Sequence, residues 1–209
     1  MPDAAASSGR IDSVDALRAI YGEPLGRAVT KEIDYISDHY RAFIEASPFV
    51  TLSTVGPEGL DCSPRGDPAG FCRVVDSHTV LMPDRRGNNR IDSLSNIVRD
   101  PRCSLLFLIP GVGETLRING HAEIRVDPDL LASFEMEGKL PRSVIKVTAE
   151  RVYFQCTKAL VRSKLWQPDS WSGERQVPTA GQILKGLEAD FDAATYDANY
   201  PEHMKNTIY

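Results

Sequence analysis

The feature that most limits the fold is a series of β-rich runs separated by short turns. Residues 48–55, PFVTLSTV, favour a strand and are followed at once by the turn GPEG. Residues 115–126, TLRINGHAEIRV, and 143–156, SVIKVTAERVYFQC, alternate between apolar and polar side chains. Most connections are too short for the crossover that neighbouring parallel strands require. The sequence therefore predicts a mainly antiparallel sheet.

Three further runs complete a sheet of about six strands. They are residues 79–82, TVLM, residues 103–109, CSLLFLI, and a bent or bulged strand over 59–75, which two prolines and three glycines interrupt. A sheet of this size tends to close on itself, because closure removes its unpaired edges. The expected fold is a six-stranded antiparallel β-barrel with peripheral helices.

Helices are expected around this sheet. A serine cap and a glycine stop bound a short helix over 13–22, and apolar residues three or four apart predict an amphipathic helix from Thr30 to residue 47. Further helices are predicted over 91–100, 127–138, 157–166 and 179–196, with an irregular segment over 199–209. The expected division is an N-terminal tail and helices (1–47), a β-barrel (48–166) and a C-terminal loop, helix and tail (167–209).

Composition excludes several classes of function. The chain of 209 residues carries a net charge of −5, which argues against broad nucleic-acid binding. No apolar run approaches the roughly 18–20 residues that cross a bilayer, so a cytoplasmic protein without membrane contact is expected. The four cysteines contain no CxxC pair and the four histidines are scattered, so no metal site is predicted.

One stretch is unusual in an acidic chain. Residues 83–90, PDRRGNNR, place three arginines and two asparagines between a strand and a helix. A helix N-terminus attracts anions, since its first N–H groups have no partner within the helix. The stretch is therefore either a phosphate site or a solvated loop whose arginines pair with Asp84 and Asp92. A second group, SPRGD at 63–67, either aims donors at a ligand or is an ordinary bulge with a surface arginine.

Together these segments resemble the FMN-binding split-barrel proteins related to pyridoxamine 5′-phosphate oxidase. The similarity extends over about residues 48–166 and is carried by the TVLMPDRRGNNR stretch, by the DPR at 100–102 with its hydrophobic strand, by the GHAE at 120–123 and by the KALVRSKLW at 158–166. The closest sub-group is that of the predicted flavin-nucleotide-binding proteins. The resemblance implies a split β-barrel that forms a homodimer, with FMN at the subunit interface.

The resemblance also implies particular cofactor contacts. The FMN phosphate would lie at Asn89 and Arg90, with Arg85 as a third contact and Asp84 and Asn88 beside them. The isoalloxazine would run along Ser63, Pro64, Arg65 and Gly66, and the ribityl chain along Met82 and Pro83. Thr115 would reach the flavin from the partner subunit, and Lys158, Arg162 and Trp166 would surround the same pocket. Trp166 is equally compatible with a core or interface position.

The chain departs from true pyridoxamine phosphate oxidases in two places. Their phosphate loop carries an Arg-Lys pair where this chain has Asn-Asn-Arg, and residues 171–186 do not resemble their substrate-binding segment. The expectation is therefore an FMN-dependent oxidoreductase with an unassigned small substrate and no assigned catalytic base. The alternatives are a non-catalytic flavin-storage or sensing protein and, with little support from the histidines, a haem-binding relative.

Overall fold

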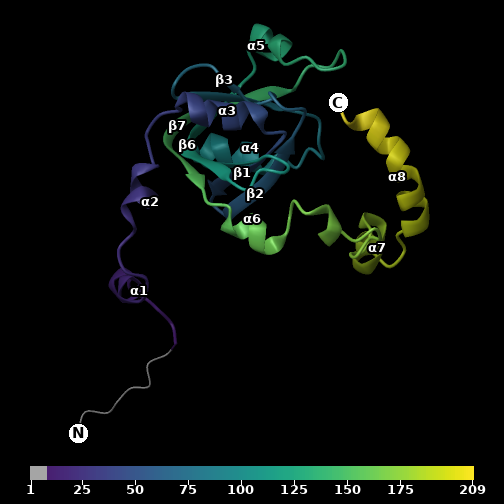
Figure 1. Cartoon of the computed structure of the whole chain (residues 1–209). Helices are drawn as coiled ribbons and strands as arrows, with labels where there is room; N and C mark the ends of the chain where they lie inside the picture. Colours follow the sequence, from purple (N-terminus) through teal and green to yellow (C-terminus); the bar gives the residue numbers. More distant parts are fainter. Residues whose placement is uncertain (1–8) are drawn as a thin grey trace. The chain divides into compact units, whose positions relative to one another are not determined.

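One antiparallel sheet organises the computed structural model, which describes residues 9–209 (Figure 1). Its seven strands follow the order β2-β1-β5-β6-β7-β4-β3. They are β1 (Phe49–Gly56), β2 (Gly59–Gly66), β3 (Arg73–Val74), β4 (Thr79–Asp84), β5 (Arg102–Leu108), β6 (Thr115–Arg125) and β7 (Ser143–Gln155). All neighbouring pairs are antiparallel. The mainly β, antiparallel prediction is confirmed, but the predicted number of six strands is wrong.

The extra strand arises where one bent strand was predicted over 59–75. The chain leaves the sheet after Gly66, turns at Pro68 and Gly70, and returns as the two-residue β3. Proline has no N–H to donate and Gly70 adopts a left-handed φ of 89°, so a continuous ladder is broken there. β2 and β3 are the two edges of the sheet and do not pair with each other. The sheet is therefore not closed, contrary to the predicted barrel.

The centre of the sheet is the long pairing of β6 with β7, which contains a register shift between Asn119 and Gly120. A Cβ atom on Gly120 would lie 1.9 Å from the backbone oxygen of Thr148. Only glycine fits this close approach without a shift of the backbone, so the bulge depends on the residue type at position 120.

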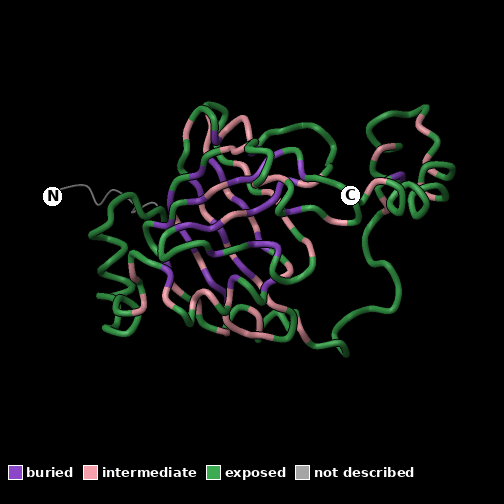
Figure 2. Tube along the Cα trace, turned by 90° about the horizontal axis from the view of Figure 1, so that it is seen from above, coloured by how far each residue is buried: buried purple, intermediate pink, exposed green. Residues whose placement is uncertain are grey.

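The core lies along the strands, where Figure 2 shows the buried segments of the chain concentrated. Alternate residues point inward, such as Val50 and Leu52 on β1 and Leu105 and Phe107 on β5, all fully buried. Helix α3 (Asp38–Ala46) adds Ile44 to this core, and α4 (Asp92–Arg99) adds Ile97. Buried residues thus alternate with more exposed ones along these strands and mark the inward face of the sheet.

The described residues divide into two compact units between Glu32 and Ile33. In the first unit, α1 (Val14–Tyr21) begins at the Ser13 cap and ends at Gly22, as predicted, and α2 (Gly26–Thr30) follows. The predicted tail over 1–9 lies almost wholly outside the described residues.

In the second unit, the amphipathic helix predicted from Thr30 begins only at Asp38. Ile33 instead forms a backbone bridge with Val152, and the N–H of Ile36 donates to Ser77 O at 2.6 Å. These backbone groups pair with distant parts of the chain, which prevents the helix from starting earlier. Helix α4 and the short α5 (Pro128–Ser133) lie within their predicted ranges.

The segment after β7 agrees with the prediction in its first helix and differs from it further along the chain. The chain after β7 forms α6 (Lys158–Ser163), the 3₁₀ turn η1 (Pro168–Ser170), α7 (Ala180–Leu187) and α8 (Ala193–Thr207). The single helix predicted over 179–196 is thus two helices, because a new cap at Asp192 accepts from the N–H of Thr195. The irregular segment predicted over 199–209 is mostly helical, with Pro201 inside α8. Among the helices in residues 9–209, none has the length and apolar character needed to span a bilayer.

Candidate functional site

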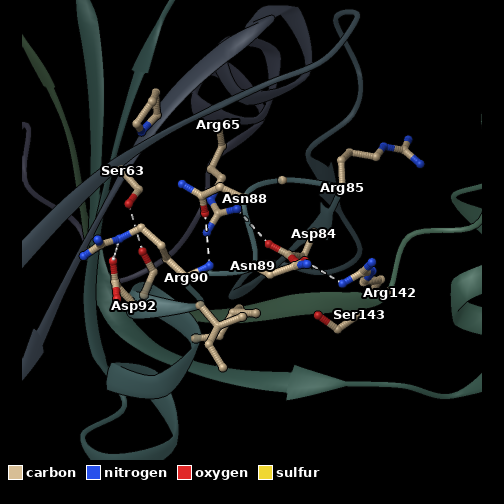
Figure 3. A pocket seen from close by; sticks show the side chains of 15 residues that line it. Ser63, Arg65, Asp84, Arg85, Asn88, Asn89, Arg90, Asp92, Arg142 and Ser143 are labelled. Atoms are coloured by element: carbon tan, nitrogen blue, oxygen red, sulfur yellow. Dashed lines mark hydrogen bonds and ion pairs between the residues drawn. The ribbon is translucent and has the colours of Figure 1, made fainter. Parts of the chain in front are cut away.

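A cavity of about 430 Å³ lies where the ends of β2 and β4, the start of β7 and the start of α4 meet (Figure 3). We call it the loop cavity, because residues 85–91 form one of its sides. Its volume is in the range of small-molecule sites. The lining residues are Ser63, Pro64, Arg65, Asp84, Arg85, Gly87, Asn88, Asn89, Arg90, Ile91, Asp92, Ser93, Leu94, Arg142 and Ser143.

The N-terminus of α4 opens into this cavity without a side-chain cap. Ile91, the capping residue, has a left-handed φ of 54° and no side-chain oxygen to accept from the first turn. Asn89 is also left-handed, with a φ of 61°. The first N–H groups of the helix and the positive end of its dipole therefore remain available to an anion.

Arg65 and Asp84 form an ion pair in the wall of the cavity. Nη1 of Arg65 lies 2.7 Å from Oδ1 of Asp84, and both side chains are largely buried. Burial raises the pKa of the Asp84 carboxyl above its usual value, and the charge of Arg65 opposes that rise. The pair connects β2 to β4 across the cavity and fixes the orientation of the Arg65 guanidinium.

Two buried donors of the same wall have no partner. Nε of Arg65 and Oγ of Ser143 are inaccessible to solvent, and neither makes a hydrogen bond within the described chain. Buried polar groups in native proteins are usually paired, and an unpaired one costs about 1–3 kcal/mol. Two such groups beside one cavity mark positions where a ligand with acceptor atoms would gain hydrogen bonds.

The remaining arginines differ in what holds them. Nε of Arg90 lies 2.7 Å from Oδ2 of Asp92 on the exposed surface, which is the pairing foreseen for a solvated loop. Nη1 of Arg142 donates to Oδ1 of Asn89 at 2.7 Å. Three arginines of the lining, Arg65, Arg90 and Arg142, outnumber its two aspartates, Asp84 and Asp92, so the local charge is positive although the chain is acidic.

Arg85 is turned toward a different partner. Its Nε donates to Oδ2 of Asp67 at 2.7 Å and its Nη1 to the backbone oxygen of Phe134 at 2.7 Å. Figure 3 shows its guanidinium directed away from Asn89 and Arg90. Arg85 therefore holds the loop in place rather than extending toward the start of α4.

The structure brings most of the predicted cofactor contacts together. Eight of them line the loop cavity, namely Ser63, Pro64, Arg65, Asp84, Arg85, Asn88, Asn89 and Arg90. Met82 and Pro83 are buried within β4, and Gly66 lines a neighbouring cavity instead. Thr115, Lys158, Arg162 and Trp166 do not line the loop cavity of the same chain. Trp166 donates its indole N–H to Val112 O at 2.9 Å.

Several lining residues were not predicted as cofactor contacts, among them Ser93, Arg142 and Ser143. Arg142 and Ser143 reach the cavity because Ser143 pairs with Asp84 in the β4–β7 register. Ser93 donates to Oδ2 of Asp61 at 2.6 Å, which links the first turn of α4 to β2. Nothing in the local sequence distinguishes these residues, since only strand pairing and helix packing bring them to the cavity.

The polar groups of the described residues were also compared with those of a metal site. Among residues 9–209, no group of three histidine, cysteine, aspartate or glutamate side chains lies close enough to hold an ion. The donors of the loop cavity are instead guanidinium, amide, hydroxyl and backbone N–H groups, a set that suits phosphate and other anions.

Comparison with known proteins assigns the family. The family model described as pyridoxamine 5′-phosphate oxidase matches residues 36–156, more than half of the chain. This range contains the whole sheet and the loop cavity. No curated protein is similar enough in sequence to be matched to the chain.

Several solved structures are similar to the chain at low sequence identity. A variant of HupZ from Group A Streptococcus is 19% identical, covering 57% of this chain and 99% of its own, with a TM-score of 0.46. A Clostridium acetobutylicum protein of the pyridoxinephosphate oxidase family, related to general stress protein 26 of B. subtilis, is 14% identical, covering 56% and 86%, with a TM-score of 0.42. A conserved hypothetical protein from Mycobacterium tuberculosis is 16% identical, covering 70% and 95%, with a TM-score of 0.45. The assignment rests on the family model: the chain belongs to the pyridoxamine 5′-phosphate oxidase family.

Proposed function

We propose that the protein binds FMN in the loop cavity and acts as an FMN-dependent oxidoreductase on a small substrate. The observation that carries the proposal is the pair of buried donors without partners, Arg65 Nε and Ser143 Oγ, in a cavity that also receives the uncapped start of α4. The family commonly binds flavin, and this donor set suits a phosphorylated ligand with several acceptor atoms.

The residues present fit FMN. The phosphate would be held by the N–H groups at the start of α4, with Asn89 and Arg90 beside them. Nε of Arg65 and Oγ of Ser143 would donate hydrogen bonds to acceptor atoms of the cofactor. Arg142 adds a further positive charge, and its bond to Asn89 orients that amide. The departure from an Arg-Lys pair is thus offset by arginines from β2 and from the start of β7.

FMN supplies electron and hydride transfer through its own ring system, so the protein needs no catalytic base for that step. What the chain contributes is orientation and charge. Arg65 is oriented by Asp84, and its guanidinium would lie near bound FMN and favour negative charge on the ring. The low exposure of this pair keeps water from the wall of the cavity and strengthens the interaction.

The proposal includes a homodimer. Thr115, Lys158, Arg162 and Trp166, which the family resemblance assigns to the flavin pocket, lie outside the loop cavity of their own chain. A second subunit is therefore needed if these side chains contact the cofactor. Analytical ultracentrifugation with and without FMN tests this part, and a monomer that binds FMN with full affinity would overturn it.

The decisive experiment is mass spectrometry of ligand released from purified protein, followed by titration of the stripped protein with FMN and riboflavin. FMN should bind far more tightly than riboflavin, because the phosphate accounts for the contacts at α4. Equal affinities would rule out the proposed phosphate site. Anaerobic addition of NADH or NADPH then separates an enzyme, whose flavin bleaches, from a storage or sensing protein, whose flavin stays oxidised.

A further inference from the structure

A second and larger cavity lies beside the loop cavity. Its volume is about 1030 Å³, and we call it the α8 cavity, because residues 196–209 form one wall. The opposite wall consists of Pro48, residues 66–68 and residues 85–88. Arg85, Gly87 and Asn88 line both cavities, so the two meet at the same loop.

The α8 cavity is closed at one side by a network centred on Asp67. Oδ1 of Asp67 accepts from the Tyr209 hydroxyl at 2.7 Å, and Oδ2 accepts from Nε of Arg85 at 2.7 Å. The Asp67 side chain is only 1% exposed. The guanidinium carbon of Arg85 also lies 5.5 Å from the centre of the Tyr209 ring. The end of α8 is thus tied to the strand ends that form the loop cavity.

Helix α8 is held from its other end as well. Asp197 accepts from the N–H of Gly181 at 3.0 Å and from the hydroxyl of Thr179, which joins the start of α8 to the start of α7. The start of α8 is therefore held against α7, and Tyr209, which lies beyond its end, is held by Asp67.

The apolar part of this wall is a row of large side chains. Tyr196, Tyr200 and Met204 are spaced four residues apart, so they lie on one face of α8. More than a third of each remains exposed, and the rings of Tyr196 and Tyr200 are 5.9 Å apart. Such a surface suits a flat aromatic ligand, which stacks on tyrosine rings and thioethers.

The charged part of the wall is cationic. Arg86 is exposed and forms no ion pair within residues 9–209, and His203 projects from α8 into the same lining. Asp67 bears the sole carboxylate side chain among the lining residues, and Arg85 already compensates its charge. An anionic group on the ligand would therefore find an unpaired cation and no uncompensated acidic side chain.

We infer that the α8 cavity binds an aromatic carboxylate and that this class is the substrate of the flavoprotein. The second half of this inference rests on the proposed function, because it needs FMN in the adjoining loop cavity. The first half rests on the α8 cavity alone: the tyrosine and methionine face receives the ring, and Arg86 with His203 receives the carboxylate.

The test uses three probes with the full chain, each measured by calorimetry on FMN-free and FMN-saturated protein. They are 2-naphthoate, the neutral 2-naphthol with the same ring system, and the non-aromatic cyclohexanecarboxylate. One 2-naphthoate should bind per chain, more tightly than either other probe. Arg86→Gln should weaken 2-naphthoate about tenfold, as expected for a lost charged contact, and leave 2-naphthol unchanged. Tyr200→Ala should weaken both aromatic probes.

Lys205→Gln is the matched control for Arg86→Gln. It removes an exposed cation from α8 that does not line the cavity. Equal losses in Arg86→Gln and Lys205→Gln would overturn the inference, as would the absence of 2-naphthoate binding in both forms of the protein. Binding of 2-naphthoate to a chain that fails to bind FMN would uphold the site and reject only the proposed function. Binding of FMN without binding of 2-naphthoate would uphold the proposed function and reject the α8 site.

Discussion

Arg85 and Asp67 form a buried ion pair that joins the segment after β4 to the segment after β2, with Nε of Arg85 2.7 Å from Oδ2 of Asp67. The Tyr209 hydroxyl donates a hydrogen bond to the other carboxylate oxygen of Asp67. One carboxylate thus anchors the loop of the first cavity and the helix of the second. Its loss should disturb both without any direct contact with a ligand.

Asp67→Ala should lower the free energy of unfolding by about 3 kcal/mol, since it leaves the largely buried Arg85 without its counter-ion. Urea unfolding followed by circular dichroism measures this loss as a lower midpoint with an unchanged m value. Asp190→Ala, at an exposed position far along the chain from this ion pair, serves as the control and should stay within about 0.5 kcal/mol of the parent chain. A neutral Asp67→Ala would show that the pair does not hold the loop.

Arg90→Ala should weaken FMN binding about tenfold and leave riboflavin binding almost unchanged, because the guanidinium would act on the phosphate. In the ligand-free chain Arg90 pairs with Asp92 on the surface, so little stability should be lost. Fluorescence titration of both ligands measures the effect. Arg99→Ala removes an exposed arginine from the far end of α4 and is the matched control. Equal losses for FMN and riboflavin would place Arg90 away from the phosphate.

Ser143→Ala should weaken FMN about fivefold, the value of one neutral hydrogen bond, without destabilising the ligand-free protein. The reason is that its hydroxyl is buried and has no partner in the described chain, so its removal costs nothing until a ligand is present. Thermal unfolding with and without FMN separates the two effects. Ser104→Ala, whose hydroxyl bonds to Asn119 outside the cavity, should leave FMN affinity unchanged. A loss of stability in ligand-free Ser143→Ala would contradict the assignment.

Gly120→Ala should destabilise the fold by about 3 kcal/mol, because the new methyl group would meet the backbone oxygen of Thr148 at 1.9 Å. Backbone of a central strand pair cannot move aside as a side chain can. Chemical denaturation gives the loss, and His121→Ala at the neighbouring exposed position provides the comparison. A loss below that of His121→Ala would show that the bulge can relax.

Raising the pH should release the end of α8. The hydrogen bond to Asp67 raises the pKa of Tyr209 above its usual value, since the phenol must keep its proton to donate. The stabilisation from this bond is fully present below the ordinary tyrosine pKa of about 10 and is lost as the pH rises through the higher value in the folded protein. Hydrogen exchange or limited proteolysis of residues 193–209 should show the change, and Tyr209→Phe should behave at pH 8 as the parent chain does at high pH. Identical pH profiles in both proteins would exclude Tyr209 as the titrating group.

Much of the fold follows from local patterns in the sequence. The alternation in TLRINGHAEIRV and SVIKVTAERVYFQC predicts β6 and β7, and the short turn after β1 predicts its antiparallel pairing with β2. Ser13 and Gly22 mark both ends of α1. These features are decided by neighbours in the sequence, which is why they can be predicted without coordinates.

The errors have a common physical cause in long-range pairing. Ile33 and Ile36 have the spacing of a helix, but their backbone groups bond to Val152 and Ser77, and the helix starts after them. The segment over 59–75 has the composition of one bent strand, but Pro68 and Gly70 divide it into β2 and β3. The count of strands and the open edges of the sheet depend on such pairings.

The sequence by itself determined that an arginine- and asparagine-rich loop stands between a strand and a helix, because that order is a local property of residues 79–99. Only the tertiary structure decided which arginine side chains lie at the cavity. Arg85 turns to Asp67, Arg65 comes across from β2, and Arg142 and Ser143 arrive through the β4–β7 register. Charge partners and buried donors are set by distances between strands, and these distances exist only after the sheet has formed.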